Sequence, residues 1–119
     1  MQRGAWIEEC PAAITVCDQQ GVIVEMNDEA AEMFRNDGGR ELIGKNILDC
    51  HPEPSRKVVE EMLEKHTSRF YTIEKDGVEK LVCQTPWMVE GQFRGIVEFV
   101  FEIKLPLPHF LRAPSKPKG

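Results

Sequence analysis

The length, composition and charge of this chain exclude several classes of protein. With 119 residues, of which 41% are hydrophobic and 29% charged, the sequence predicts one soluble globular domain with a single core, and no apolar run approaches the ~20 residues that a membrane span needs. Residues 1–103 carry 11 basic and 20 acidic residues, a net charge of −9, which argues against nucleic-acid binding.

Residues 1–11 are predicted to be a short lead-in to the domain. Trp6 and Ile7 offer apolar side chains to a neighbouring surface, and Pro11 would end any helix that precedes it. The lead-in is therefore a candidate docking or dimerisation segment. It contains one arginine and no continuous apolar region, which argues against a secretory signal, so we expect a cytoplasmic protein.

A hairpin and a short helix are predicted next. Residues 13–18 and 22–26 are rich in strand-forming residues, and the turn composition Asp-Gln-Gln-Gly separates them. Asn27 then stands as a candidate helix cap before two acidic residues, which predicts a short helix ending near Asn36. Residues 37–39 are predicted to form a flexible loop.

A histidine and two prolines precede a long amphipathic helix. Pro52 and Pro54 suit an open first helical turn, because proline has a fixed φ and no amide donor. From Val58 to Leu63, apolar residues recur on one face and predict contact with a core. His51 would point to that same side if the helical phase extends back to it. It is either a ligand that faces a cavity or a residue that caps the helix start or is hydrogen-bonded locally.

Three strands complete the predicted sheet. The Asp-Gly pair at 76–77 is the strongest hairpin signal in the chain, and it joins residues 69–75 to residues 78–87. Residues 92–103 alternate in period two, with Val97, Phe99, Phe101 and Ile103 on one side and Glu98 and Glu102 on the other. This order of elements predicts an α+β fold, with one five-stranded antiparallel sheet and helices packed on one face.

Residues 104–119 are predicted to be a proline-rich, basic, extended tail. They contain four prolines, four basic residues and no acidic residue, without any periodic pattern. The tail is either solvated or in contact with an acidic surface of a partner. Leu107, Phe110 and Leu111 are candidates for tethering it to the domain.

The cysteines and polar residues do not form a recognisable catalytic or zinc motif. Cys10, Cys17, Cys50 and Cys83 lack the spacing of a zinc site or a redox dithiol, and four buried thiols in a reducing compartment are expected. Ser55 has no base at a sensible spacing, and no phosphate-binding glycine loop is present. We therefore expect a protein that is not an enzyme.

The order of these segments resembles the PAS domain, a small sensory module of bacterial signalling proteins. The resemblance covers about residues 12–103. It rests on ITVCDQQGVIVEMNDEAAEMF with its Asp-x-x-Gly turn and helix-starting Asn, on ELIGKNILDCHPEPSR with its His-Pro helix start, and on the strands DGVEKLV and FRGIVEFVFEI.

The resemblance implies a pocket between the inner face of the sheet and the long helix. In different PAS domains this pocket holds haem, flavin, a metabolite or nothing. Flavin is disfavoured, because the Asn-Cys-Arg-Phe-Leu-Gln motif of light-sensing flavin PAS domains is absent. Haem-binding PAS regulators that sense carbon monoxide carry a similar His-Pro-Glu-x-Ser-Arg run, in which the histidine is an axial iron ligand. Haem is therefore a candidate cofactor, with His51 as a metal ligand only if haem is bound, and no second ligand is evident.

Eleven residues are predicted to line this pocket or to bind within it. His51 is the candidate ligand, and Arg56 either meets a haem propionate or a ligand carboxylate or is solvated in the first turn of the helix. The apolar candidates are Phe34, Ile47, Val59, Met62, Leu63, Phe70, Leu81, Val97 and Phe99. The same residues would equally form a filled core, and Met62 is either a distal ligand or a gap-filler.

Two functions are compatible with this reading. The first is a sensory and regulatory module that binds a small ligand or cofactor in the pocket and signals through a partner protein or a homodimer. The alternative is a cofactor-free module for protein–protein interaction or dimerisation. Neither nucleic acid nor a membrane is an expected partner, and if the chain is complete its output passes to another protein.

Overall fold

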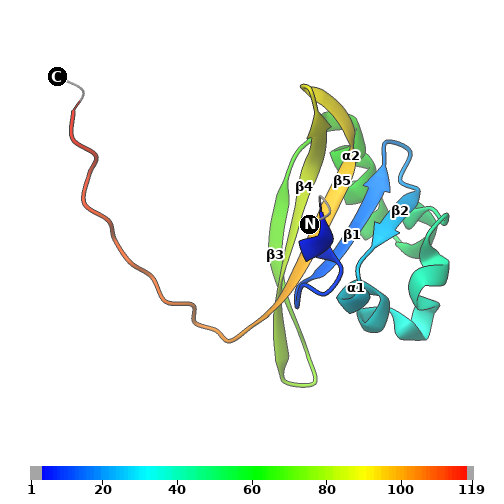
Figure 1. Cartoon of the computed structure of the whole chain (residues 1–119), viewed down its shortest axis with the longest axis horizontal. Helices are drawn as coiled ribbons and strands as arrows, with labels where there is room; N and C mark the ends of the chain where they lie inside the picture. The colour runs from blue at the N-terminus through cyan, green and yellow to red at the C-terminus, as the bar shows by residue number, and fades with distance from the viewer. Residues whose placement is uncertain (1–3, 118–119) are drawn as a thin grey trace.

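The computed structural model describes residues 4–117, except the side chain of Cys50, and its centre is one five-stranded antiparallel sheet (Figure 1). The strands lie in the order β2-β1-β5-β4-β3, so the last strand of the chain occupies the middle of the sheet. Their bounds are β1 Ala13–Asp18, β2 Ile23–Met26, β3 Arg69–Lys75, β4 Val78–Val89 and β5 Gln92–Ile103. The predicted α+β fold with a five-stranded sheet is confirmed.

The helices lie between β2 and β3 in the sequence, apart from one short turn near the amino terminus, and they cover one face of the sheet (Figure 1). The two α-helices are α1 Asp28–Met33 and α2 Ser55–Lys65. The 3₁₀ helices are η1 Ala5–Ile7, η2 Arg35–Asp37, η3 Gly39–Leu42 and η4 Ile47–Cys50. Residues 37–39, predicted as a flexible loop, belong mostly to η2 and η3 because glycines at 38 and 39 adopt positive φ and allow two tight turns in succession.

The turn of the first hairpin is built by Asp18. Its Oδ1 accepts hydrogen bonds from the amides of Gln20 and Val22, both at 2.9 Å, and Gly21 adopts a φ of 89°. An aspartate side chain that bonds the backbone two residues ahead is a common turn-former. The hairpin is thus as predicted, although β2 begins at Ile23 because Val22 forms an isolated bridge with Asn46.

Asn27 caps α1 as predicted and also ties the lead-in to the domain. Its Oδ1 accepts from the amides of Ala30 at 3.0 Å and Ile14 at 2.9 Å, while its Nδ2 donates to the carbonyls of Ile7 and Ala12, both at 2.9 Å. The side chain is completely buried. The side-chain amide of Asn27 therefore joins the lead-in, β1 and α1. Its NH2 group and its oxygen are both hydrogen-bonded.

The period-two pattern of β5 separates two sets of residues, but it does not say which set faces the helices. Val82 on β4 and Ile96 and Val100 on β5 are buried and face the helices. Val97 and Phe99 occupy the alternate positions on β5 and face away from the helices. The bulky run predicted to face the pocket is therefore on the outer face, and the prediction was wrong because both faces of this strand are partly apolar.

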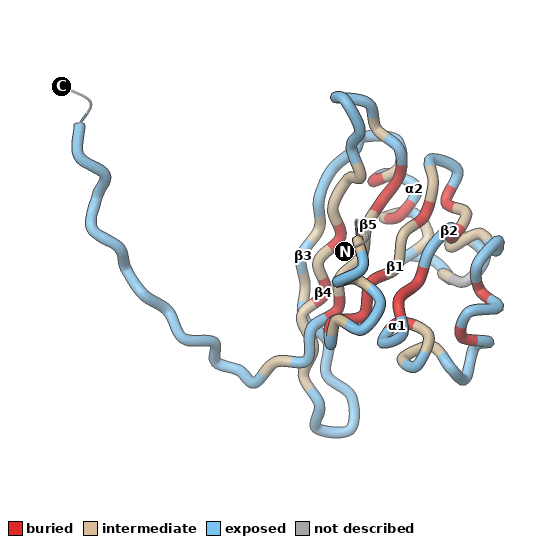
Figure 2. The backbone as a smooth tube through the Cα atoms, viewed as in Figure 1, coloured by how far each residue is buried: buried red, intermediate tan, exposed pale blue. Residues whose placement is uncertain are grey.

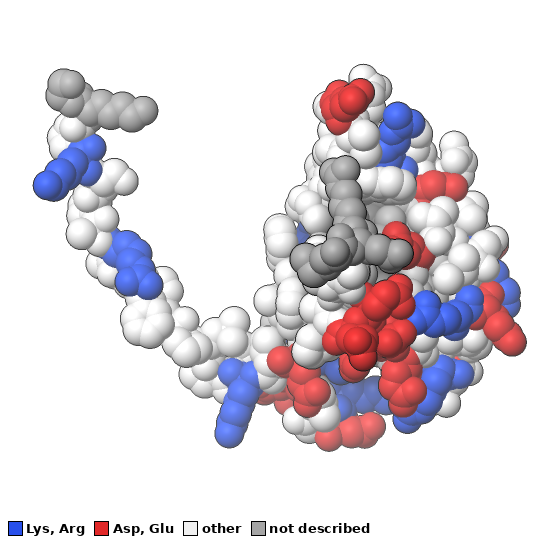
Figure 3. Space-filling model, viewed as in Figure 1, with Lys and Arg blue, Asp and Glu red and all other residues white. Residues whose placement is uncertain are grey.

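The carboxyl-terminal tail runs away from the domain without regular structure (Figure 2). Residues 104–117 contain no helix or strand, and Leu107, Phe110 and Leu111 are 49%, 69% and 94% exposed, so the predicted tethering by these side chains is not observed. Figure 3 shows lysine and arginine side chains along the described tail and acidic side chains only on the domain. Among residues 4–117, every helix is too short or too polar to cross a membrane.

Candidate functional site

A cavity of about 690 Å³ lies between the inner face of the sheet and the helices that cover it. Its apolar lining comes from strands, from the end of α1, from η3 and η4, and from α2. These residues are Ile23, Met33, Phe34, Leu42, Ile47, Val59, Met62, Ile73, Val82, Ile96 and Val100. The polar or ionisable lining residues are Thr15, Cys17, Asp37, Lys45, His51, Tyr71, Lys80, Gln84 and Glu98. The lining is thus mixed, with apolar residues from both layers and most polar groups on the sheet.

Five of the eleven predicted pocket residues line this cavity. They are Phe34, Ile47, His51, Val59 and Met62. All five come from the helical layer, where the spacing of α2 and the position of His51 just before it indicated the correct side. Val59 and Met62 are each 4% exposed and form the buried face of α2.

Six predicted pocket residues lie elsewhere, so that part of the prediction was wrong. Four of them are strand residues on the outer face, namely Phe70, Leu81, Val97 and Phe99. Leu63 packs beside the Cys17, Met62 and Ile96 cluster without lining the cavity. Arg56 is the second residue of α2 and pairs with Glu60 at 3.1 Å on the partly exposed side of that helix.

His51 lines the cavity and also makes the local hydrogen bond that was one of its two predicted roles. Its Nδ1 lies 2.6 Å from the carbonyl oxygen of Ile47. Because a carbonyl only accepts hydrogen bonds, Nδ1 carries the proton and donates, which leaves Nε2 as the acceptor nitrogen of the neutral ring. The bond fixes both the orientation and the tautomer of a ring that borders the cavity.

The sheet contributes a polar wall that the sequence prediction missed. Gln84 on β4 and Glu98 on β5 are direct partners in the antiparallel register, and Gln84 Nε2 donates to Glu98 Oε2 at 2.8 Å. Burial raises the pKa of Glu98, while the hydrogen bond from Gln84 and the nearby His51 oppose that rise. Tyr71 on β3 borders the same wall, and its pKa is raised by burial and by the charge of Glu98.

Gln84 carries an unusual feature within this wall. The residue is 6% exposed, and its Oε1 is buried without a hydrogen-bond partner in the described part of the chain. Leaving a buried carbonyl unpaired costs about 1–3 kcal/mol. The one sequence signal for this wall was a glutamate at 98 in the middle of the apolar run GIVEFVF, where a charged residue is unexpected unless it is paired or functional.

Cys17 is the cysteine of the cavity lining. It is 3% exposed, and burial raises the pKa of its thiol. Cys10 and Cys83 are only partly buried, so the expectation of uniformly buried thiols was wrong for these two. Nowhere in residues 4–117 do three or more His, Cys, Asp or Glu side chains gather as a metal site.

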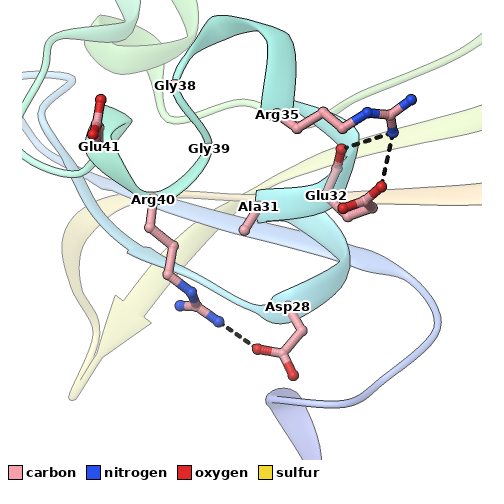
Figure 4. Close-up of a pocket in the computed structure, with 8 residues that line it drawn as sticks. All are labelled: Asp28, Ala31, Glu32, Arg35, Gly38, Gly39, Arg40 and Glu41. Carbon is pink, nitrogen blue, oxygen red and sulfur yellow. Dashed lines mark hydrogen bonds and ion pairs between the residues drawn. The ribbon is translucent and has the colours of Figure 1, made fainter.

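A second depression, of about 540 Å³, lies between α1 and η3 (Figure 4). Arg35 pairs with Glu32 at 2.9 Å, and Arg40 forms an ion pair with Asp28 and donates to the carbonyl of Met26 at 2.8 Å. The Arg40 contacts hold η3 against α1, and the Arg35 pair joins η2 to the end of α1, so both arginines are engaged. The depression is therefore best explained as a structural contact between two short helices.

The family model described as PAS fold matches residues 2–92 of the chain. Three similar solved structures have TM-scores near 0.6. The PAS domain of Bordetella pertussis BvgS has a TM-score of 0.62 and 22% identity, covering 84% of this chain and 82% of that one. A sensory box sensor histidine kinase from Vibrio cholerae has a TM-score of 0.59 and 20% identity, covering 83% and 87%.

The third structure is the Aer2 receptor from Vibrio cholerae, described as a dual PAS-heme oxygen sensor. It has a TM-score of 0.59 and 18% identity, covering 78% of this chain and 95% of that one. A search of curated protein sequences found no match. At these identities, the structural likeness shows the fold.

Proposed function

Because the chain belongs to the PAS family, we propose that it is a sensory module whose cavity binds a small ligand and whose sheet passes the change to a partner protein or to a second copy. The observation that carries the proposal is the cavity itself, about 690 Å³ with a polar wall on the central strands. A fully packed core would leave no such space. A buried carbonyl without a partner on that wall also favours an occupant that donates a hydrogen bond.

β5 offers a route from the cavity to the rest of the molecule. Glu98 lies on this strand, which pairs with β1 on one side and with β4 on the other. Residues 104–117 follow the end of β5 directly. A ligand that moves Glu98 would therefore move the strand that carries the outer-face residues and the tail. We propose these two regions as the output surfaces of the module.

Haem fits the cavity only in part. His51 would hold the iron through Nε2, because Nδ1 is engaged with Ile47, and Met62 would supply a sulfur from α2. Arg56 is not available for a propionate in this arrangement, since it pairs with Glu60 outside the cavity. Gln84 and Glu98 also place an amide and a carboxylate where the face of a macrocycle would need apolar cover. A smaller, more polar ligand suits the lining better.

A module for protein–protein interaction is the second candidate, and exposed apolar residues favour it. Phe70 and Phe101 are 65% and 39% exposed on the sheet, and the tail exposes Phe110 and Leu111. Exposed aromatic residues are common at protein interfaces. This function and ligand sensing are compatible, because the cavity and the outer face are opposite sides of one sheet.

Amide NMR with a fragment panel tests the proposal. The panel contains carboxylic acids, amines, neutral aromatics and haemin, and binding in the cavity should shift the amides of Thr15, Val82 and Glu98. The amides of Asp76 and Gly77, at the tip of the β3–β4 hairpin, are the internal reference. If no fragment moves the cavity amides, and self-association moves only outer-face amides, the interaction module is the better account.

Visible absorption tests whether haem is the ligand. Haemin bound through His51 should give a sharp visible absorption band that His51→Ala abolishes. His66→Ala is the matched control, because His66 is exposed and stacks on Phe93 with a centroid distance of 3.8 Å, away from the cavity lining. A band that survives both substitutions would be non-specific haemin adsorption.

A further inference from the structure

We propose that the cavity selects a cationic ligand with N–H donors, such as an amidinium or a protonated amine, which binds against the hydrogen-bonded side chains of Gln84 and Glu98. This inference rests on the proposed ligand-sensing function and specifies the chemistry of the ligand. Its basis is a pair of hydrogen-bond acceptors on adjacent strands of the cavity wall. The ligand is expected to supply the N–H donors that these acceptors lack.

Gln84 supplies the first acceptor. Its Nε2 faces Glu98 at 2.8 Å, an orientation that a carboxylate requires because it cannot donate to an amide oxygen. The amide oxygen, Oε1, is then turned away from Glu98 and has no partner among the described residues. The residue is 6% exposed, so bulk water does not readily satisfy this oxygen. A ligand N–H would do so.

Glu98 supplies the second acceptor and the charge. In the described part of the chain, the hydrogen bond from Gln84 is the one that its carboxylate receives, which leaves acceptor capacity unused. Gln84 and Glu98 are directly opposite in the β4–β5 register, so their side chains emerge next to each other. A ligand with two N–H groups can therefore donate to both residues at once.

The charges around this pair favour a cation at Glu98. His51 and Tyr71 both interact with this carboxylate, and the one hydrogen bond that it receives among the described residues comes from the neutral amide of Gln84. Two lysines also line the cavity, but Lys45 is exposed and Lys80 lies four residues from Gln84 along β4. An anionic ligand would have to use these lysines and avoid the Glu98 wall. A cationic and an anionic probe therefore distinguish binding at Glu98 from binding at the lysines.

The experiment compares benzamidine, benzamide and benzoate, which share one aromatic ring and differ in charge and in hydrogen-bonding groups. Binding to the full chain is measured by calorimetry and by amide NMR. Benzamidine should bind at least about tenfold more tightly than benzoate, as expected for charge-assisted hydrogen bonds. Its binding should shift the amides of Gln84 and Glu98.

Variants then test the two acceptors. Glu98→Gln removes the charge and keeps the shape, and Gln84→Met removes the amide at similar length; each should weaken benzamidine by about tenfold or more. Glu102→Gln is the matched control, because Glu102 lies on β5, is exposed and does not line the cavity. It should leave the affinity unchanged. If Gln84→Met does not fold, Glu98→Gln alone decides the role of the charge.

Three outcomes would overturn the inference. They are benzoate binding as tightly as benzamidine, benzamidine binding that is insensitive to Glu98→Gln, and the absence of benzamidine binding. If benzoate or another fragment still shifts the cavity amides, the sensory proposal stands and only the ligand class is wrong. If nothing in the fragment panel shifts those amides, the ligand-sensing proposal fails as well.

Discussion

Gln84 and Glu98 face each other across β4 and β5 and share a 2.8 Å hydrogen bond on the wall of the cavity. The pair is 14 residues apart in the sequence and lies on the two longest strands of the sheet. A carboxylate in this position is costly to keep charged, since burial raises its pKa. The stability of the domain should therefore depend on pH through Glu98.

Glu98→Gln should stabilise the free protein at neutral pH. A raised pKa means that, between the unfolded value near 4.5 and the higher folded value, the native state binds more protons than the unfolded state. Stability contributed at Glu98 is therefore present at low pH and is lost as pH rises through that window. We expect a gain of about 1 kcal/mol at pH 7 that disappears below pH about 4.

Urea unfolding of both proteins across this pH range measures the effect. Glu102→Gln is the control, since Glu102 is exposed on the same strand. A gain from Glu98→Gln that stays constant from acid to neutral pH would show that packing, and not ionisation, is responsible.

Asn27→Ala should be strongly destabilising. The substitution strips hydrogen bonds from the buried amides of Ile14 and Ala30 and from the carbonyls of Ile7 and Ala12. We expect a loss of about 3 kcal/mol or more, because each buried group left unpaired costs about 1–3 kcal/mol. Chemical denaturation checks this value.

The Asn27→Asp variant separates the two roles of this side chain. It keeps the acceptor that caps α1 and removes the donor that holds the lead-in, so hydrogen exchange should rise in residues 4–12 more than in α1. Asn36→Ala, at an exposed position, should change stability by no more than about 0.5 kcal/mol. Equal losses of stability in Asn27→Asp and Asn36→Ala would contradict the role of Asn27 in tethering the lead-in.

Gly95→Ala should disrupt the pairing of β1 with β5. A Cβ at this position would lie 1.9 Å from the carbonyl oxygen of Cys17, which is backbone and cannot move aside cheaply. We expect a loss of about 3 kcal/mol or more, at the upper end of the cost of overpacking. Thermal unfolding provides the measurement.

Gly77→Ala is the comparison for Gly95. Gly77 has a φ of 78° in an exposed turn, and a Cβ there would meet nothing within 4 Å, so the substitution adds backbone strain without a clash. Its cost should be about 1 kcal/mol. If both alanine variants lost the same amount of stability, the close approach of Gly95 to Cys17 would not be the cause of the destabilisation.

Cys17 should be the slowest of the described cysteines to react with iodoacetamide. Its thiol is buried and its raised pKa keeps the thiolate fraction low at pH 8, whereas Cys10 and Cys83 are only partly buried. Peptide mapping at successive times should show Cys17 labelled last in the native protein and at the same rate as the others in urea. Early labelling of Cys17 in the native protein would indicate that the cavity opens readily to reagents.

Local sequence patterns determined much of this fold. Asp18 and Gly21 specify the first turn, Asn27 caps α1, and the Asp-Gly pair at 76–77 specifies the second hairpin. Strands β3 and β5 have the bounds predicted from residues 69–75 and 92–103. These features depend on contacts between residues close in sequence, so composition and spacing were sufficient to predict them.

Only the tertiary structure decided which face of the sheet borders the cavity. Period two divides β5 into two sets of residues, but it does not say which set the helices cover, and the more apolar set turned out to face outward. The polar wall arises because the β4–β5 register brings Gln84 opposite Glu98, while α2 encloses the space in front of them. His51, Met62, Gln84 and Glu98 come from separate elements. Their meeting at one cavity depends on long-range packing, which no local pattern encodes.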